Sequence, residues 1–309
     1  MKDNYGRHAF TMTELVVAIA IVGLLAAIVG PAVQSSRESA RRAHCSNNLR
    51  QLGIALANVA ESHGDFPTST TPVPAFWRLL PSLGHAPLFD ELSTKGIASQ
   101  LNVSEFVCPD DSLHLMGFGN SNYYFNDGTR FRWDVPRNGF RISPQSDTSA
   151  ADISDGLSNT AAMSERLVGV PTFDPPSNDV MEKEPRRYFW FSAVRYNQKG
   201  QELLATNECR NNRTTVFPQF AGTYIQQYRE AGAGYNHMLT PNEAACYNGP
   251  EDLNIDTSSF LKPPSSMHPN GVNVLYADGS VHFIADGISD DAWRALGTRN
   301  GSEATNISF

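Results

Sequence analysis

The sequence predicts an α+β fold in which a long N-terminal membrane-spanning helix packs on a mainly antiparallel, β-rich domain. Three observations support this class. An apolar stretch runs from Phe10 to Val33, a helical stripe of apolar residues follows it, and two β-rich runs near the C-terminus are joined by an Asp-Gly pair. The remainder of the 309-residue chain is long enough to bury a sizeable core.

The first element is the stretch FTMTELVVAIAIVGLLAAIVGPAV, in which Glu14 is the single ionisable residue. At ~1.5 Å per residue it forms roughly 36 Å of helix, enough to cross a bilayer with some tilt. A secretory signal peptide has a shorter apolar run that ends in a small-residue cleavage site, and no such site closes this one. The stretch therefore predicts a single-pass anchor that is retained.

The same helix is predicted to continue to about Ser62. Pro is absent between Ser35 and His63, and apolar residues recur there at helical spacing, namely Cys45, Leu49, Leu52, Leu56 and Val59. Pro31 is expected to kink the helix, because a mid-helix proline removes one hydrogen bond. Gly64 and Pro67 are expected to end it.

Shorter elements follow in order. Two short helices are predicted at Phe76–Pro81 and Leu88–Leu92, and short strands at Glu105–Cys108, Tyr123–Phe125 and Tyr188–Tyr196. The segment Ala151–Gly169 suggests a turn that leads into an apolar strand or helix.

The C-terminal region predicts a hairpin followed by a helix. The stretch GVNVLYADGSVHFIA, residues 271–285, contains two β-rich runs joined by Asp278-Gly279, a pair that favours a tight turn. Ser289 is expected to cap a short helix that continues through Leu296. His268 precedes Asp278 by ten residues, so this region carries an H-x9-D-G motif.

The net charge of −8 gives no electrostatic support for a nucleic-acid partner. Basic residues flank the apolar stretch on both sides, and long C-terminal domains translocate largely regardless of charge. Charge alone therefore does not orient the anchor.

The short basic leader MKDNYGRHA, Phe10 and Glu14 together resemble the prepilin signal of type IV pilins and type II secretion pseudopilins. The resemblance implies that a prepilin peptidase in the cytoplasmic membrane cleaves between Ala9 and Phe10 and methylates Phe10. It also implies that Glu14 pairs with the N-terminal amine of a neighbouring subunit. The family usually has Gly where this chain has Ala9. The alternative is a plain signal anchor whose Glu14 extends to the membrane interface.

Several separate motifs resemble those of a large planctomycete family, whose members join a prepilin-type methylation motif to a domain of unknown function. They are CSNNL at residue 45, FVCP at 106, DISDGLSNT at 152, H-x9-D-G, and WRALG at 293. The resemblance covers Phe10 to about Glu303. It implies a pilin-like fold with a leader over 1–9, a helix over 10–63 and an extracytoplasmic domain over 64–309, and it implies no assigned reaction.

Four cysteines fit an extracytoplasmic location, where disulfides persist. Three connectivities are possible. Because Cys45 lies on the helical stripe that faces the domain, a Cys45–Cys108 bond would attach the helix to the domain, and Cys209–Cys246 would then close a second loop. The alternative is four free thiols. No C-x2-C spacing exists, which disfavours a zinc site.

The sequence allows two sharper site hypotheses. His268, Asp278 and a serine could form a hydrolase triad, but no G-x-S-x-G motif accompanies them. The simpler interpretation is that Asp278 and Gly279 set a turn and that His268 hydrogen-bonds the hairpin. Asp152, Asp155 and Asn159 could supply oxygen ligands to calcium, as in the major pseudopilins, yet a turn or helix cap explains them equally well.

Two function classes remain. In the first, the chain is a structural subunit that associates with itself or with other pilin-like subunits in an envelope filament or type II secretion-type assembly. In the second, it is a membrane-anchored module that binds a glycan, a peptide or an ion. Glu14 favours the first, because a simple tether gains nothing from a carboxylate inside the membrane. An enzyme is the third choice, and no cofactor is predicted.

Overall fold

A computed structural model describes most of the chain, and Ala9 and Phe10 lie outside the described residues. The described residues are 12–68, 73–95, 103–113, 120–130, 137–142, 146–169, 183–196, 198, 200–217, 234–248 and 260–301. The chain divides into two compact units, Met1–Ala43 and His44–Phe309. Each unit is described by itself.

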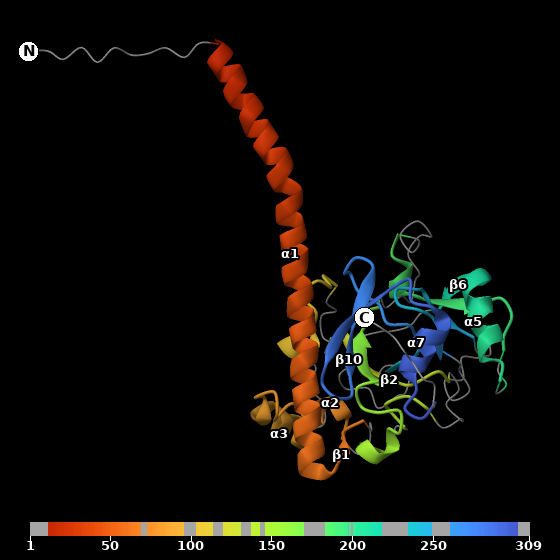
Figure 1. Cartoon of the computed structure of the whole chain (residues 1–309). Coiled ribbons are helices and arrows are strands. Elements are labelled where there is room, and N and C mark those ends of the chain that lie inside the picture. The colour runs from red at the N-terminus through yellow and green to blue at the C-terminus, as the bar shows by residue number, and fades with distance from the viewer. Residues whose placement is uncertain are drawn as a thin grey trace, which may run out of the picture. The chain divides into compact units, whose positions relative to one another are not determined.

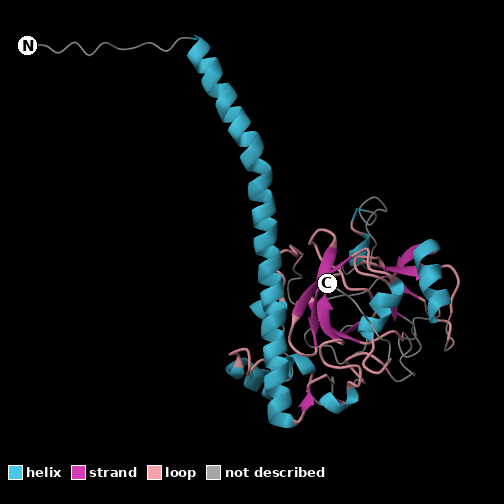
Figure 2. Cartoon of the chain, viewed as in Figure 1, coloured by secondary structure: helices cyan, strands magenta, loops and turns pink. Residues whose placement is uncertain are grey.

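The long helix α1 (Met12–His63) confirms the predicted N-terminal element (Figures 1 and 2). It continues through Pro31, so the kink stays a prediction. From Met12 to Arg37 its side chains are exposed, whereas within the second unit Cys45, Leu49, Leu52, Leu56 and Val59 are buried. The helix ends where Gly64 takes a φ of +90°, a conformation that glycine adopts without the strain a Cβ brings.

A five-stranded sheet forms the centre of the second unit. Its order is β11-β10-β4-β2-β7, and every pairing is antiparallel except the parallel pair β2–β7. The strands are β2 (Tyr123–Asn126), β4 (Ala161–Glu165), β7 (Gly234–Tyr235), β10 (Gly271–Tyr276) and β11 (Val281–Ala285). The predicted strand at 123–125 and the C-terminal hairpin are therefore confirmed. The segment 151–169, for which strand and helix were both open, contains a strand.

Alternate side chains on these strands enter two different cores. Tyr123 and Phe125 of β2 pack with Leu49, Leu52 and other residues from the second half of α1. Tyr124 points to the opposite core, where α7 (Asp290–Gly297) supplies Trp293 and Leu296. The sheet therefore lies between the second half of α1 and α7, because consecutive strand residues face opposite sides.

A smaller four-stranded sheet, ordered β6-β5-β8-β9, contains the predicted aromatic strand. Its members are β5 (Phe189–Ser192), β6 (Arg213–Phe217), β8 (Ala245–Tyr247) and β9 (Phe260–Leu261), with β5 and β8 parallel. Helix α5 (Glu202–Asn211), which the sequence did not predict, packs Ala205 and Cys209 against Cys246 and Leu261. The strands β1 (Asp65–Phe66) and β3 (Thr148–Ser149) pair in an antiparallel two-stranded ribbon.

The short helices α2 (Ala75–Leu79) and α3 (Ala86–Lys95) and the capped helix α7 confirm three predictions. Ser289 Oγ accepts from Ala292 N at 3.3 Å, as expected for an N-cap.

The strand predicted at 105–108 is wrong, because the structure has a 3₁₀ turn there, η1 (Ser104–Phe106). Asn48 of α1 donates to the carbonyls of Ser104 (3.3 Å) and Val107 (2.9 Å), so side-chain bonds replace a strand partner. Tertiary contacts outweigh the β propensity of this segment. Two further 3₁₀ turns are η2 (Ala150–Asp152) and η3 (Pro185–Arg187).

Candidate functional site

The first candidate site is the exposed apolar part of α1. Its large apolar side chains from Met12 to Val33 are between 43% and 82% exposed, which a water-facing helix would not tolerate. Among the described residues, α1 is the helix that is long and apolar enough to cross a membrane. This is a single-pass membrane anchor, and the β-rich domain follows it along the chain.

Glu14 lies in the first turn of α1. A carboxylate is favoured there by the positive end of the helix dipole. The predicted pairing of Glu14 with a neighbouring subunit stays a prediction.

The second candidate site surrounds a disulfide. The structure joins Cys45 in α1 to Cys108 after η1, and Cys209 in α5 to Cys246 in β8. These are the two pairings that the sequence analysis described, out of three possible connectivities. The first bond attaches the second half of α1 to the loop after η1, within the same core.

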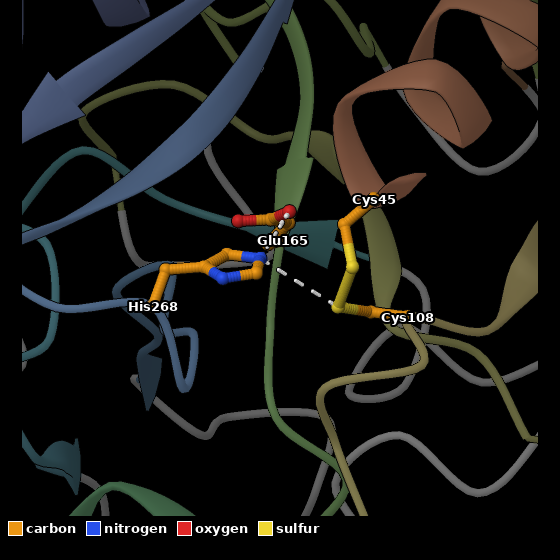
Figure 3. A group of neighbouring side chains, drawn as sticks. All are labelled: Cys45, Cys108, Glu165 and His268. Carbon is orange, nitrogen blue, oxygen red and sulfur yellow. Dashed lines mark hydrogen bonds and ion pairs between the residues drawn. A yellow bond between two sulfur atoms is a disulfide. The ribbon is translucent and has the colours of Figure 1, made fainter. Parts of the chain in front are cut away.

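The His268 imidazole lies against the Cys45–Cys108 bond (Figure 3). Its Nε2 is 3.8 Å from Cys108 Sγ and 3.6 Å from Glu165 Oε1, and its Nδ1 is 3.3 Å from Asp110 Oδ2. The side chains of His268 and Glu165 are 0% and 2% exposed. The histidine of the H-x9-D-G motif therefore lies beside a buried disulfide, the buried carboxylate of Glu165 and the partly buried carboxylate of Asp110.

Neighbouring strands position this cluster. Glu165 ends β4, and its two oxygens accept from the backbone N (2.8 Å) and Nδ2 (2.7 Å) of Asn273 in β10. His268 N donates to Ser266 Oγ, which donates to Gly271 O at the start of β10. The H-x9-D-G motif predicts that His268 hydrogen-bonds the hairpin. The ring lies 3.6 Å from Glu165, which is hydrogen-bonded to β10 of the hairpin, and it also lies close to Cys108 and Asp110.

Asp278 and Gly279 form the turn of the hairpin. Asp278 Oδ1 accepts from Ser280 N (2.9 Å) and Ser280 Oγ (2.7 Å), and Gly279 has a φ of +88°. Tyr276 N donates to Ser280 O, so three residues, 277–279, lie between the two members of this hydrogen-bonded pair. This geometry is a type I turn followed by a left-handed glycine.

The hydrolase triad of His268, Asp278 and a serine stays a hypothesis: His268 contacts Cys108, Asp110 and Glu165, whereas the side chain of Asp278 contacts Ser280. The group at the hairpin turn uses a different histidine, His282. Ser280 Oγ lies 2.7 Å from Asp278 and 3.2 Å from His282 Nε2, so the serine stands between the acid and the imidazole. In a catalytic triad the histidine occupies the middle position, because it takes the serine proton while the acid orients it.

The residues weighed as calcium ligands serve as turn and cap groups. Asp152 Oδ2 accepts from Ser149 N and Ser149 Oγ in a capping box, which lowers the pKa of Asp152. Asp155 Oδ2 accepts from Gly301 N at 2.6 Å, and Asn159 donates to Asp155 O. Calcium binding by this group stays an untested alternative to the turn and cap roles.

A buried charge cluster was missed by the sequence analysis. Asp127 Oδ1 accepts from Arg141 Nε at 2.7 Å, and Lys262 Nζ lies 3.5 Å from Oδ2. Burial raises the pKa of Asp127, but Arg137, Arg141 and Lys262 outweigh it and hold this pKa far below its usual range.

The cations of this cluster repel one another. Burial lowers the pKa of Lys262 to about 7, and repulsion from Arg141, Arg166 and Arg137 adds to this while Asp127 opposes it. No local pattern reveals such a group, because its members come from four separate stretches of the sequence.

Comparison with known proteins gives two family matches. The model described as a protein of unknown function (DUF1559) matches residues 34–291, and the prokaryotic N-terminal methylation motif matches residues 5–30. The first match includes the five residues around the disulfide (Cys45, Cys108, Asp110, Glu165 and His268), and the second includes Glu14. No curated protein and no solved structure matches the chain.

Proposed function

Because this chain belongs to the DUF1559 family and carries a prokaryotic N-terminal methylation motif ahead of the family domain, we propose that it is a pilin- or pseudopilin-like structural subunit. It would take part in an envelope filament or a type II secretion-type assembly. The single observation that carries this proposal is the methylation motif over residues 5–30, which overlaps the exposed apolar part of α1. The same matches favour a structural subunit over an enzyme.

The proposal assigns a role to each N-terminal segment. Residues 1–9 are a leader that a prepilin peptidase removes, and Phe10 becomes the methylated N-terminus. Residues 10–63 are the membrane and assembly helix, and 64–309 form the extracytoplasmic domain. Glu14 then meets the new amine of a neighbouring copy, because a carboxylate inside the membrane is tolerated when it is paired.

A membrane-anchored binding module is the competing hypothesis. In that case α1 only tethers the domain, the leader stays in place, and Glu14 extends to the membrane interface. The two hypotheses therefore differ in the mature N-terminus and in the consequence of removing Glu14.

The test is intact mass and N-terminal sequencing of the protein from native membranes. We expect a chain that starts at a methylated Phe10. An Ala9→Gly variant, which restores the residue usual in prepilins, should be cleaved at least as completely, and a Phe10→Asp variant should show how far cleavage depends on this site. A wild-type chain that still starts at Met1 would contradict the proposal and support the tether.

A further inference from the structure

The cluster around His268 contains the donor set of a metal site. Cys45, Cys108, Glu165 and His268 are all buried, and one ligand atom from each lies within 4.8 Å of every other (Figure 3). The four residues come from α1, the loop after η1, the end of β4 and the loop before β10. The fold therefore brings two sulfurs, one imidazole and one carboxylate to a common point.

The distances suit zinc. For zinc–ligand bonds of about 2.0–2.3 Å in a tetrahedron, sulfur and nitrogen ligands lie about 3.6 Å apart, and nitrogen and oxygen ligands about 3.3 Å apart. The corresponding distances from His268 Nε2 are 3.8 Å to Cys108 Sγ and 3.6 Å to Glu165 Oε1. The two sulfurs, now bonded to each other, would have to separate to similar spacing.

Surrounding groups orient both of the ligands that are not cysteines. Asp110 Oδ2 lies 3.3 Å from His268 Nδ1. In the tautomer in which Nδ1 donates to this carboxylate, Nε2 offers its lone pair on the side of Cys108 Sγ and Glu165 Oε1. Asn273 holds Glu165 through two hydrogen bonds. A carboxylate behind a histidine ligand is the usual outer support of zinc sites.

We propose that the chain binds one Zn²⁺ through Cys45, Cys108, His268 and Glu165 when the Cys45–Cys108 disulfide is reduced. A dithiol reductant supplies two electrons and two protons, becomes a disulfide itself and leaves two thiols. Zinc then binds both sulfurs as thiolates, and the two thiol protons pass to solvent. Oxidation of the thiolates by a disulfide oxidant reverses the sequence and releases the metal.

This site is a redox switch that does not depend on filament assembly. In a chain whose cysteines have not yet been oxidised, zinc holds the second half of α1 against the loop after η1. After oxidation the disulfide makes the same connection. The absence of a C-x2-C spacing disfavours zinc at the level of sequence. These ligands escape that pattern because the two cysteines are 63 residues apart and the other two ligands lie further along the chain.

The experiment uses the full chain in detergent, freed of metal with a chelator. One sample is oxidised and one is reduced with a phosphine, which offers no thiol of its own. Zinc is added, unbound metal is removed, and zinc per chain is measured by mass spectrometry. Cobalt(II) in place of zinc reports geometry through its tetrahedral absorption bands and its thiolate charge-transfer band.

We expect one metal per reduced chain and none per oxidised chain. The Cys209→Ser/Cys246→Ser variant should bind as the wild type does, whereas Cys45→Ser/Cys108→Ser should not bind. His268→Ala should lose the tetrahedral cobalt spectrum, and Asp110→Asn should weaken binding about tenfold, as expected for an outer support.

Two results would overturn the proposal. The reduced wild type could bind no metal, including the case in which reduction unfolds the chain and zinc does not restore its circular dichroism. Alternatively, the Cys45→Ser/Cys108→Ser variant could bind zinc as tightly as the wild type. Circular dichroism of every variant shows whether a loss of binding reflects a loss of fold.

Discussion

At the scale of single residues, the interior of the second unit contains more positive than negative charge around Asp127. Arg141 is fully buried and Lys262 is 5% exposed, and the described contacts of both include the same carboxylate. A charge removed from water is stabilised only by close partners of opposite sign. Several cations that share the single carboxylate of Asp127 therefore each gain less stabilisation than one cation paired with it alone. Lys262 shows the consequence in its lowered pKa.

The lowered pKa of Lys262 predicts a pH dependence of stability. Its pKa is about 7 in the folded chain and 10.5 ordinarily, so between these values the unfolded chain binds a proton that the folded chain does not. The free energy of unfolding should therefore rise with pH in this window, by up to about 1.4 kcal/mol per pH unit. Lys262→Met should flatten this rise.

The measurement is chemical denaturation at two pH values inside the window and below 10.0, the ordinary pKa of tyrosine. Lys183→Met is the matched control, because Lys183 is exposed, and this variant should keep the wild-type slope. An equal slope in Lys262→Met and the wild type would show that Lys262 stays protonated in the folded chain.

At the scale of elements, the β10–β11 hairpin depends on backbone geometry at Gly279. Its φ is +88°, and no heavy atom lies within 4 Å of an added Cβ. Gly279→Ala should therefore destabilise by strain alone, about 1–2 kcal/mol, and Gly279→Asn by less. Gly287→Ala meets open space without a positive φ, so it should change stability by less than about 0.5 kcal/mol. Equal melting temperatures for the Gly279→Ala and Gly287→Ala variants would contradict this account.

The two disulfides allow a comparison of two loops in one chain. They join residues 63 and 37 positions apart, for which the chain-entropy model gives about 4 kcal/mol each and a difference of about 0.5 kcal/mol. Cys45→Ala/Cys108→Ala and Cys209→Ala/Cys246→Ala should therefore lower the free energy of unfolding by similar amounts in urea titrations. A much larger loss for the first pair would indicate that the bond also holds the His268 cluster together.

At the scale of the whole molecule, assembly is predicted to depend on Glu14. Glu14→Ala should still be cleaved and methylated, because the leader and Phe10 are unchanged, but cross-linking between copies in native membranes should fall about tenfold or more. This corresponds to the loss of about 1.4 kcal/mol from one buried ion pair. Glu38→Gln, on the same helix but beyond the apolar stretch, is the control and should cross-link as the wild type does. Undiminished cross-linking of Glu14→Ala would remove the support that Glu14 lends to assembly.

The sequence by itself determined the elements that depend on neighbouring residues. Apolar length predicted the anchor, 3.6-residue periodicity predicted the helix to about Ser62, and Asp-Gly and Ser289 predicted the hairpin and the capped helix. These signals are local, because each comes from a single continuous stretch of the sequence. The wrong strand at 105–108 marks the limit, since Asn48 decided that segment from 56 to 59 residues away.

Only the tertiary structure decided which distant groups meet. It chose one connectivity of the cysteines from three, paired β2 with β7 and β5 with β8 in parallel, and gathered the groups around Asp127. It also set His268 between Asp110, Glu165 and a disulfide, although the motif suggested a role in the hairpin. The physical reason is that such contacts follow from how whole faces pack, and no short stretch of sequence encodes the partner that a buried side chain finds.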